Sequence, residues 1–426
     1  MKQLISASFL TLLLLNVSFS FGQNFLKKSK KYIHPFSEIN SEVLTNHIDK
    51  IADSARIIGL GEVSHYTREC YELKQQIIHK LIDKGYDALV LEVDFGQALL
   101  WNDYVVNGVG NIDSIIAQSG WFTYRTQEFK DLLISIREHN KTADKPFQVY
   151  GMEMTAINYN LEWLADYLDG TENAEDLIDQ LNQERKTVAF QQHSPDEVLS
   201  YWTLFYDLKK YLDQHTELLI EQKGDRSYQI AMQMTEITRQ YATYISQDDF
   251  LLKVEFRDHF STRNVLWALD YLAEDSQIVI WAHNGHIAKE SALFYYEVLG
   301  SYLSDWFGDQ YYSIGFTFNE GDFGAFGLDG FSKFTLPPVT ESSITKDFDG
   351  FNSNYLFFDI RRNLNRKKAR NKPPFIANVP IRMDISESYN RPEGDNPMME
   401  IDLSHSYDCL IYIDRTNYPT TIEWDN

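Results

Sequence analysis

Short apolar runs recur along the chain, and several of them stop abruptly at a glycine or an ionisable residue. The run Ala55–Leu60 is followed at once by Gly61, Glu62 and, three residues later, His65. It is β-branched and apolar enough for a strand buried on both faces. From Glu69 to Lys84 the apolar residues recur at helical spacing, so this part of the chain is predicted to be a strand, a loop and a helix.

The same pattern predicts further elements on either side. Strands are expected at Ala88–Leu91, Phe147–Tyr150, Gln277–Ala282, Tyr311–Phe318, Tyr355–Asp359 and Cys409–Ile413, and helices at Asn40–Ile51, Leu99–Val106 and Glu128–Glu138. Strand and helix alternate three times at the start, which favours a parallel sheet with right-handed crossovers. The glycine-punctuated stretch Asp322–Pro338 is expected to be a loop over the site, because long irregular segments in compact domains are often functional.

Between about Ala156 and Leu272 the pattern changes to long helical periodicity with almost no strand signal. We expect helices around Leu161–Leu168, Leu199–Leu212, Tyr228–Tyr244 and Leu251–Leu272. The prediction is an α/β fold with a mostly parallel central sheet flanked by helices, and with a large helical insertion at about 156–272. This single domain would span residues 24–426, with the insertion forming one side of a substrate cleft.

The first residues have the layout of a secretory signal peptide. Lys2 precedes an apolar segment from Leu4 to Val17, and small residues follow up to about Gln23. This segment is shorter than the ~20 residues that a membrane span needs, and no later stretch is long and apolar enough. We therefore expect residues 1–23 to be removed and the protein to be exported, periplasmic or secreted, without a membrane span.

The charge and composition narrow the class of partner. The net charge of −23 and the pI near 4.8 argue against nucleic acid and against an anionic membrane surface, and the one basic cluster, Arg361–Lys372, is short. The chain has 26 Tyr and 27 Phe, residues that line sites for large apolar small molecules. Cys70 and Cys409 are the only cysteines, so one disulfide at most can form, and Cys70 is expected to be a small buried residue.

Four predicted strands end in ionisable residues. These are Glu62 with His65, Glu92, Glu153, and His283 with His286. The carboxyl ends of parallel strands meet at one edge of a sheet, where ligands bind in open α/β folds. Burying several carboxylates and imidazoles together is costly unless they pair or perform chemistry, so we expect a functional site there.

The motifs that are absent restrict the chemistry. The sequence has no Gly-x-Ser-x-Gly, no Walker phosphate loop, no dinucleotide glycine fingerprint and no His-Glu-x-x-His. Histidines flanked by carboxylates suit general-base activation of water, and hence hydrolysis. The same groups could form a catalytic zinc set, but the spacing His283-x-x-His286 runs through a glycine turn. A reaction without metal or cofactor is therefore favoured, and a metal enzyme stays the alternative.

These motifs together resemble the erythromycin esterase family. They are Gly59-Leu60-Gly61-Glu62-Val63-Ser64-His65, Glu69 and Lys74, the strand ending at Glu92, Arg257-Asp258 with Asn264, and Trp281-Ala282-His283-Asn284-Gly285-His286. The resemblance covers about Ile51 to Gly321. It implies an esterase, a hydrolase that opens the lactone ester of macrolides through a histidine-activated water and so confers antibiotic resistance.

The resemblance also implies roles for single residues. His65 corresponds to the general base, Glu62 and Glu92 to essential carboxylates, and His283 and His286 to the second histidine loop. Four positions are expected to contact the substrate. Lys74 stands where Arg is frequent, Glu153 where Asp is common, Tyr66 where Gly is frequent, which would narrow the mouth of the site, and Arg257 lies in the quoted motif.

Two other functions stay open at this point. The same mechanism could serve another ester or amide. A fold resembling this family's also occurs in haem-binding proteins, so a non-catalytic haem- or iron-binding protein of the envelope is the alternative from a different class.

Overall fold

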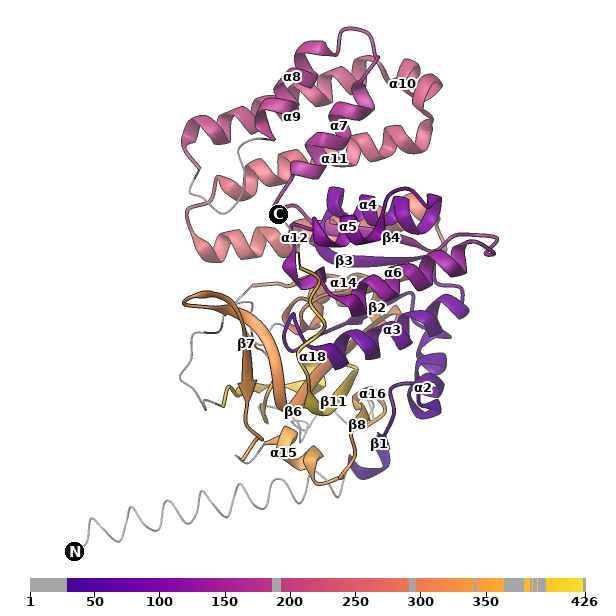
Figure 1. Ribbon diagram of the computed structural model, residues 1–426, viewed down its shortest axis with the longest axis vertical. Coiled ribbons are helices and arrows are strands. Elements are labelled where there is room, and N and C mark those ends of the chain that lie inside the picture. The colour runs from indigo at the N-terminus through magenta and orange to yellow at the C-terminus, as the bar shows by residue number, and fades with distance from the viewer. Residues whose placement is uncertain are drawn as a thin grey trace, which may run out of the picture.

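The computed structural model describes residues 29–185, 193–290, 296–340, 343–363, 379–383, 385, 389 and 396–423. Within them a nine-stranded sheet has the order β1-β8-β11-β6-β2-β5-β3-β4, with β7 paired to β6 (Figure 1). The strands are β1 Ile33–Phe36, β2 Ile57–Leu60, β3 Ala88–Asp94, β4 Gln148–Glu153, β5 Ile278–Trp281, β6 Tyr311–Gly327, β7 Gly330–Leu336, β8 Tyr355–Asp359 and β11 Cys409–Thr416. β9 Val379–Ile381 and β10 Met399–Ile401 form a separate pair.

The central part of the large sheet is parallel, as predicted. The pairs from β4 through β3, β5, β2 and β6 to β11 are all parallel, whereas β8, β1 and β7 are antiparallel to their neighbours. Every residue of β2, β3 and β5 is buried. Both faces of these strands are therefore covered, which explains why their sequences are continuous apolar runs and do not alternate with polar residues.

Helices cover the two faces of the sheet. Outside the insertion they are α2 Glu42–Ala52, α3 Arg68–Asp83, α4 Phe95–Asn107, α5 Ile112–Ala117, α6 Gln127–Asn140, α13 Asn284–Ile287, α14 Leu299–Phe307, α15 Ile344–Asp349, α16 Ile360–Asn363 and α18 Leu403–Ser406. Leu73 of α3 and Phe129 of α6 pack in one core cluster with Ile58 of β2, and Leu303 of α14 packs with Ile57 in the other. Adjacent β2 residues thus serve opposite cores, as the two-residue period of a strand requires.

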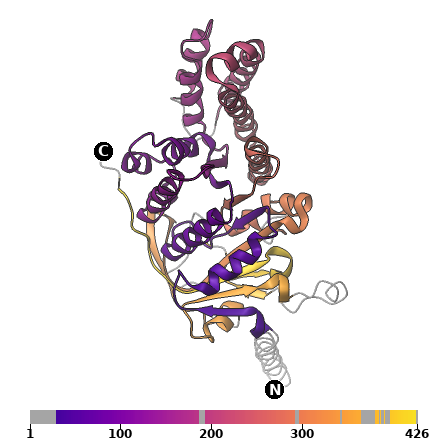
Figure 2. The same ribbon diagram turned by 90° about the vertical axis from the view of Figure 1, so that its right-hand side faces the viewer.

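The stretch between β4 and β5 is helical throughout its described part. It contains α7 Asn158–Leu168, α8 Glu175–Glu184, α9 Pro195–Gln214, α10 Thr216–Lys223, α11 Asp225–Ile245 and α12 Phe250–Leu272. In Figures 1 and 2, α7 to α11 lie at one end of the molecule, beyond the β4 edge of the sheet. α12 instead packs with the sheet, and its residues Val265 and Leu269 belong to the same core as Ile57.

The prediction of a loop at Asp322–Pro338 is wrong. β6 does not end near Phe318 but continues to Gly327, and β7 returns antiparallel to it, with Phe323 opposite Phe334. The glycines that suggested a loop allow close packing inside this hairpin. A Cβ on Gly324 would lie 2.7 Å from the rings of Tyr66 and Phe331, so only glycine fits there without a shift.

The remaining expectations concern the cysteines and the N-terminus. Cys70 and Cys409 are both free and buried, and Cys70 is the small core residue that the sequence suggested. The predicted signal peptide lies outside the described residues, as does most of the basic cluster Arg361–Lys372. None of the helices in the described part of the chain is long and apolar enough to cross a membrane.

Candidate active site

The ionisable residues that follow the parallel strands meet at one edge of the sheet. Glu62 and His65 lie in the loop after β2, Glu92 lies near the end of β3, Glu153 ends β4, and His283 is the N-cap of α13 after β5. α12 adds three further polar side chains to this edge, those of Arg257, Asp258 and Ser261. The predicted convergence is therefore present, and helix α12 of the insertion takes part in it.

Glu62 is the centre of the first half of the site. Its carboxylate accepts hydrogen bonds from Lys74 Nζ at 2.5 Å, from the indole Nε1 of Trp281 at 2.9 Å and from His65 Nδ1 at 2.8 Å. Burial alone would raise the pKa of Glu62, but the charge of Lys74 and the bond from His65 lower it to about 2. Glu62 is therefore a carboxylate at neutral pH and can only accept protons from its partners.

His65 is oriented from two sides. Nδ1 faces Glu62, and the backbone carbonyl of His65 accepts a hydrogen bond of 2.7 Å from the hydroxyl of Tyr71. Because an ionised carboxylate accepts only, Nδ1 carries the proton and the lone pair of the neutral ring is on Nε2. The ring centroid of His65 lies 5.0 Å from that of His283. The two imidazoles thus flank one small region at the edge of the sheet.

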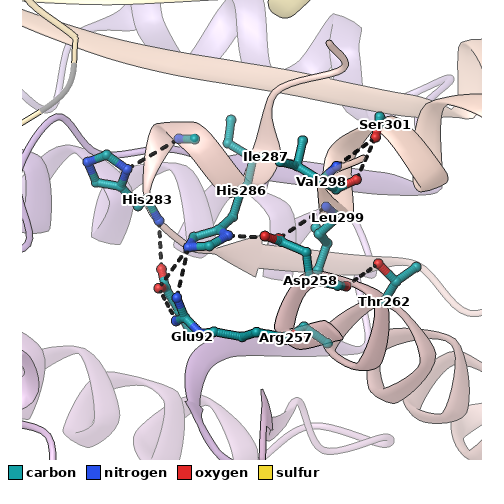
Figure 3. A network of polar contacts seen from close by, with 12 residues as sticks. Glu92, Arg257, Asp258, Thr262, His283, His286, Ile287, Val298, Leu299 and Ser301 are labelled. Atoms are coloured by element: carbon teal, nitrogen blue, oxygen red, sulfur yellow. Dashed lines mark hydrogen bonds and ion pairs between the residues drawn. The ribbon is translucent and has the colours of Figure 1, made fainter. Parts of the chain in front are cut away.

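His283 is held in the opposite tautomer. Its Nδ1 accepts the backbone N–H of Gly285 at 3.3 Å, so in the neutral ring the proton is on Nε2. The backbone N–H of His283 donates to Glu92 Oε2 at 2.8 Å, which fixes the start of the loop (Figure 3). One histidine of the facing pair therefore presents an acceptor nitrogen and the other a donor.

Glu92 is the centre of the second half of the site (Figure 3). Its Oε1 lies 2.6 Å from Arg257 Nη2 and 3.3 Å from His286 Nε2. Burial would raise the pKa of Glu92, but His286 and Arg257 hold it well below the ordinary value. Arg257 also donates from Nε to Glu153 Oε2 at 2.9 Å, so one guanidinium joins two buried carboxylates.

His286 is bound by carboxylates on both ring nitrogens. Nδ1 lies 2.7 Å from Asp258 Oδ1 and Nε2 lies 3.3 Å from Glu92 Oε1. Burial by itself would lower the pKa of His286, but Asp258 and Glu92 raise it to about 10. Arg257 Nη1 is also 3.2 Å from Nε2 and can donate to it only when the ring is neutral. The two carboxylates favour the imidazolium, so His286 is a cation at neutral pH and not a base.

Glu153 is almost fully enclosed, as is Asp258, each being 1% exposed. It is bound by Arg257 and by the hydroxyl of Ser261, which donates to Oε1 at 3.2 Å. Burial raises the pKa of Glu153 despite the nearby charge of Arg257. The side chain of Arg257 is 20% exposed, and the expected contact of Glu153 and Arg257 with substrate stays a prediction. Glu153 is almost fully buried, and the guanidinium of Arg257 is engaged with Glu92 and Glu153.

Lys74 and Tyr66 are both buried beside the site, and their expected contact with substrate stays a prediction. Lys74 is fully buried, with Nζ on Glu62 and 4.2 Å from the centre of the Trp281 ring. Tyr66 is also buried, its ring set edge-on to Phe331 and its hydroxyl 3.1 Å from Thr421 Oγ1. The large side chain that follows His65 therefore anchors the β6–β7 hairpin and the C-terminal segment.

Two buried carboxylates of this edge were not singled out from the sequence. Asp258 holds His286, and the signal was only its place next to Arg257 in the motif. Asp94 accepts from the indole Nε1 of Trp121 at 2.6 Å and from the backbone N–H of Ala156 at 2.8 Å, and burial raises its pKa to about 7. Its position two residues after Glu92 was visible, but both partners are distant in sequence.

The histidines and carboxylates are paired with one another and with cations. Within the ranges that the structure describes, no group of three or more His, Cys, Asp or Glu side chains is arranged to hold a metal ion. His283 and His286, the two histidines of the motif with metal-like spacing, are bound by different partners, Gly285 and Asp258 (Figure 3).

The fold and the site define an α/β protein with a polar site at the carboxyl edge of its sheet, built from two histidine loops and helix α12. Comparison with known proteins gives the family. The sequence profile of the erythromycin esterase family matches residues 82–416, which is most of the chain, and the protein belongs to this family. Membership indicates a hydrolase.

Individual relatives are distant. The chain is 23% identical over 404 residues to erythromycin esterase type II of Escherichia coli, covering 86% of this chain and 91% of that protein. A crystal structure of a Bacillus cereus protein superposes with a TM-score of 0.78 at 22% identity, covering 96% of this chain and 99% of that one. The open conformation of a histidine-to-asparagine mutant of the erythromycin esterase EreC has a TM-score of 0.68 at 15% identity, covering 92% and 100%. At these identities the structures establish the shared fold.

Proposed function

We propose that the protein is an exported esterase that hydrolyses a lactone ester in a large, mainly apolar small molecule, with macrolides as the substrate class. The observation that carries this proposal is the facing pair of imidazoles in opposite tautomers. His65 presents an acceptor nitrogen and His283 a donor, with ring centroids 5.0 Å apart. Family membership and the relative named erythromycin esterase type II support the choice of macrolides.

The first step is the activation of water by His65. Nε2 takes a proton from a water molecule as its oxygen attacks the acyl carbon of the ester. The imidazolium that forms keeps its Nδ1–H on Glu62, whose charge is held by Lys74 and stabilises the cation. Glu62 and Lys74 thus act on the base from behind, which agrees with their burial and requires no contact with substrate.

His283 stabilises the oxyanion of the tetrahedral intermediate. Its Nε2–H donates to the oxygen on which negative charge develops, while Gly285 holds Nδ1. The intermediate then breaks the acyl C–O bond, and the leaving alkoxide takes the proton from His65. One water is added, and the products are an alcohol and a carboxylic acid on the same opened chain; at neutral pH the acid releases its proton to solvent.

The cluster of Glu92, Arg257, Asp258 and His286 supports this reaction without taking a proton from water. His286 is cationic because Asp258 and Glu92 raise its pKa to about 10, so it cannot be the base near neutral pH. Glu92 fixes the backbone of His283, and Arg257 and His286 hold Glu92. The cluster therefore sets where the oxyanion donor lies.

The proposal is tested by incubating the purified protein with a panel of macrolides of different ring size in H₂¹⁸O. Mass spectrometry should show a gain of one water, with one ¹⁸O in the new carboxylate, because water attacks the acyl carbon. The folded His65→Asn variant should hydrolyse the panel ~10²- to 10⁴-fold more slowly than the parent. If no macrolide gains water while simpler lactones or esters do, the mechanism stands and the substrate class is wrong. If label enters the alcohol, the attack at the acyl carbon is wrong.

A further inference from the structure

Asn284 lies between His283 and Gly285 as the first residue of α13, and it is 2% exposed. Its side chain makes three hydrogen bonds to backbone. Nδ2 donates to the carbonyl of Phe316 at 2.9 Å and to that of Met383 at 2.8 Å, and Oδ1 accepts from the N–H of Phe316 at 3.0 Å. All the hydrogen-bonding capacity needed to bury this amide is thus met by backbone of other segments.

The bonds to Phe316 replace a missing part of the sheet. The last ladder bond from β2 to β6 runs from the N–H of Gly61 to the carbonyl of Ile314. In a parallel ladder the next bonds on this side of β6 belong to the N–H and the carbonyl of Phe316. The chain leaves the sheet after Gly61, and the Asn284 amide takes both positions. It extends the sheet by one residue without a strand.

The backbone on either side of Asn284 joins the two histidine loops. The N–H of Asn284 donates to the carbonyl of Glu62 at 2.9 Å, and the hydroxyl of Tyr407 donates to the carbonyl of Asn284 at 2.9 Å. A Cβ on Gly61 would lie only 2.2 Å from Asn284 Oδ1, so this glycine makes room for the amide. Asn284 therefore contacts the β2 loop, β6 and the segment at Met383 together.

We propose that Asn284 is a positioning residue, whose side chain completes the sheet beyond β2 and fixes the loop of Glu62 and His65 against the loop of His283. It acts through the two imidazoles and touches neither substrate nor the reacting atoms. Its kinetic consequence rests on the hydrolysis proposed above. A displacement of about 1 Å between groups that act on one transition state can cost ~10²-fold in rate.

The chain contains a matched control. Asn140, at the end of α6, makes the same set of bonds: Nδ2 donates to the carbonyls of Phe147 at 2.8 Å and Val105 at 3.0 Å, and Oδ1 accepts from the N–H of Phe147 at 2.8 Å. Phe147 precedes β4, at the edge of the sheet opposite the site. Asn140→Ala removes as many hydrogen bonds as Asn284→Ala but leaves the histidine loops untouched.

The first experiment needs no substrate. The imidazole ¹⁵N spectra of the parent, assigned with His65→Asn and His283→Asn, should show Nδ1–H for His65 and Nε2–H for His283. Folded Asn284→Ala should show mixed tautomers for both rings and a weakened Nδ1–H signal of His65, whereas Asn140→Ala should match the parent. Parent-like signals in folded Asn284→Ala, or equal changes in Asn140→Ala, would overturn the proposal.

The second experiment measures kinetics on a substrate of the parent. Asn284→Ala should lower kcat by ~10²-fold with KM within about threefold of the parent, while Asn140→Ala changes both by less than threefold. A parent-like kcat for Asn284→Ala would overturn the proposal. If the parent hydrolyses nothing, the proposed function fails and the imidazole spectra alone decide the role of Asn284. Should Asn284→Ala not fold, Asn284→Asp, which has the same shape but lacks the two donor bonds, carries both measurements.

Discussion

At the scale of single residues, the contacts of each imidazole with nearby carboxylates determine its protonation and its proposed role. One carboxylate on Nδ1 fixes a proton there, so the lone pair of the neutral His65 ring is on Nε2. Two carboxylates, one on each nitrogen, raise the pKa of His286 to about 10 and keep it protonated. The Nδ1 of His283 accepts a backbone N–H, so in the neutral ring Nε2 is the donor. The proposed division into base, cation and oxyanion donor follows from these contacts.

The buried carboxyl group of Asp94 should make the stability of the protein depend on pH. Asp94 is buried and accepts hydrogen bonds from two N–H groups. Burial raises its pKa to about 7, although the two N–H donors and the charge of Arg257 lower it, and the charge of Glu153 adds to the increase. This pKa is above that of an Asp in the unfolded chain, so between the two values the folded state holds a proton that the unfolded state has lost. The contribution of this proton to the free energy of unfolding is lost as the pH rises through about 7. Between pH 5 and 8 the loss should be on the order of 2 kcal/mol.

Urea denaturation of the parent and of Asp94→Asn at several pH values measures this loss. Asp94→Asn is expected to be less stable overall, since one of its two N–H contacts has no acceptor, but its free energy of unfolding should lack the downward trend of the parent. Equal pH trends in the two proteins would show that Asp94 is ionised throughout this range.

At the scale of elements, the ends of β2 and β5 were predictable, whereas β3, β4 and β6 continue beyond their predicted ends. Contacts between residues far apart in the sequence were not predictable. An apolar run followed by Glu62 or His283 shows directly where a buried strand meets a polar edge. The bonds of His286 to Asp258 and of Asp94 to Ala156 join residues far apart in sequence, so no local pattern encodes them. The β6–β7 hairpin was missed because Gly324 is needed for close packing against Tyr66 and Phe331, which a local sequence pattern cannot distinguish from a glycine in a loop.

At the same scale, we predict that helix α11 of the insertion influences substrate choice. Tyr244 on α11 is partly buried, and burial raises its pKa, with smaller opposing effects from the charges of Arg257 and Glu153. If the insertion contacts substrate, Tyr244→Ala should raise KM by ~10-fold with kcat nearly unchanged, because a lost apolar contact of about 1.4 kcal/mol affects ground state and transition state alike.

Tyr206 on α9 is the matched control for this variant, since it is 63% exposed. Tyr206→Ala should leave both constants unchanged. Steady-state kinetics on the best substrate of the panel compare the two variants. A fall in kcat at constant KM for Tyr244→Ala would move this residue from substrate binding to the reaction itself.

At the scale of the whole molecule, the expected fate is export. The apolar segment Leu4–Val17 is too short to span a bilayer, and a chain with a net charge of −23 is repelled by anionic membrane surfaces. The mature protein should therefore begin near Ser20–Asn24 and be recovered outside the cytoplasm in the soluble fraction. N-terminal sequencing of the exported form measures this. Recovery of intact Met1 in the membrane pellet would show that the segment is retained.

The site also depends on the whole molecule, because its parts are spread from Glu62 to His286 and close only when β2, β3, β4, β5 and α12 are in place. The central claim is that His65 is the base of this assembled site and His283 the oxyanion donor. The variants His65→Asn and His283→Asn, and the double variant, isolate these roles. Asparagine preserves the size of the contact but cannot take a proton from water at neutral pH.

The most direct test is the measurement of kcat and substrate affinity for these three variants, with circular dichroism confirming that each is folded. His65→Asn should lose ~10²- to 10⁴-fold in kcat and His283→Asn ~10²- to 10³-fold, both with nearly unchanged affinity. The double variant should be little worse than His65→Asn alone, because both groups act on one transition state. Folded His65→Asn that hydrolyses the substrate at near the parent rate would contradict the assignment of the base.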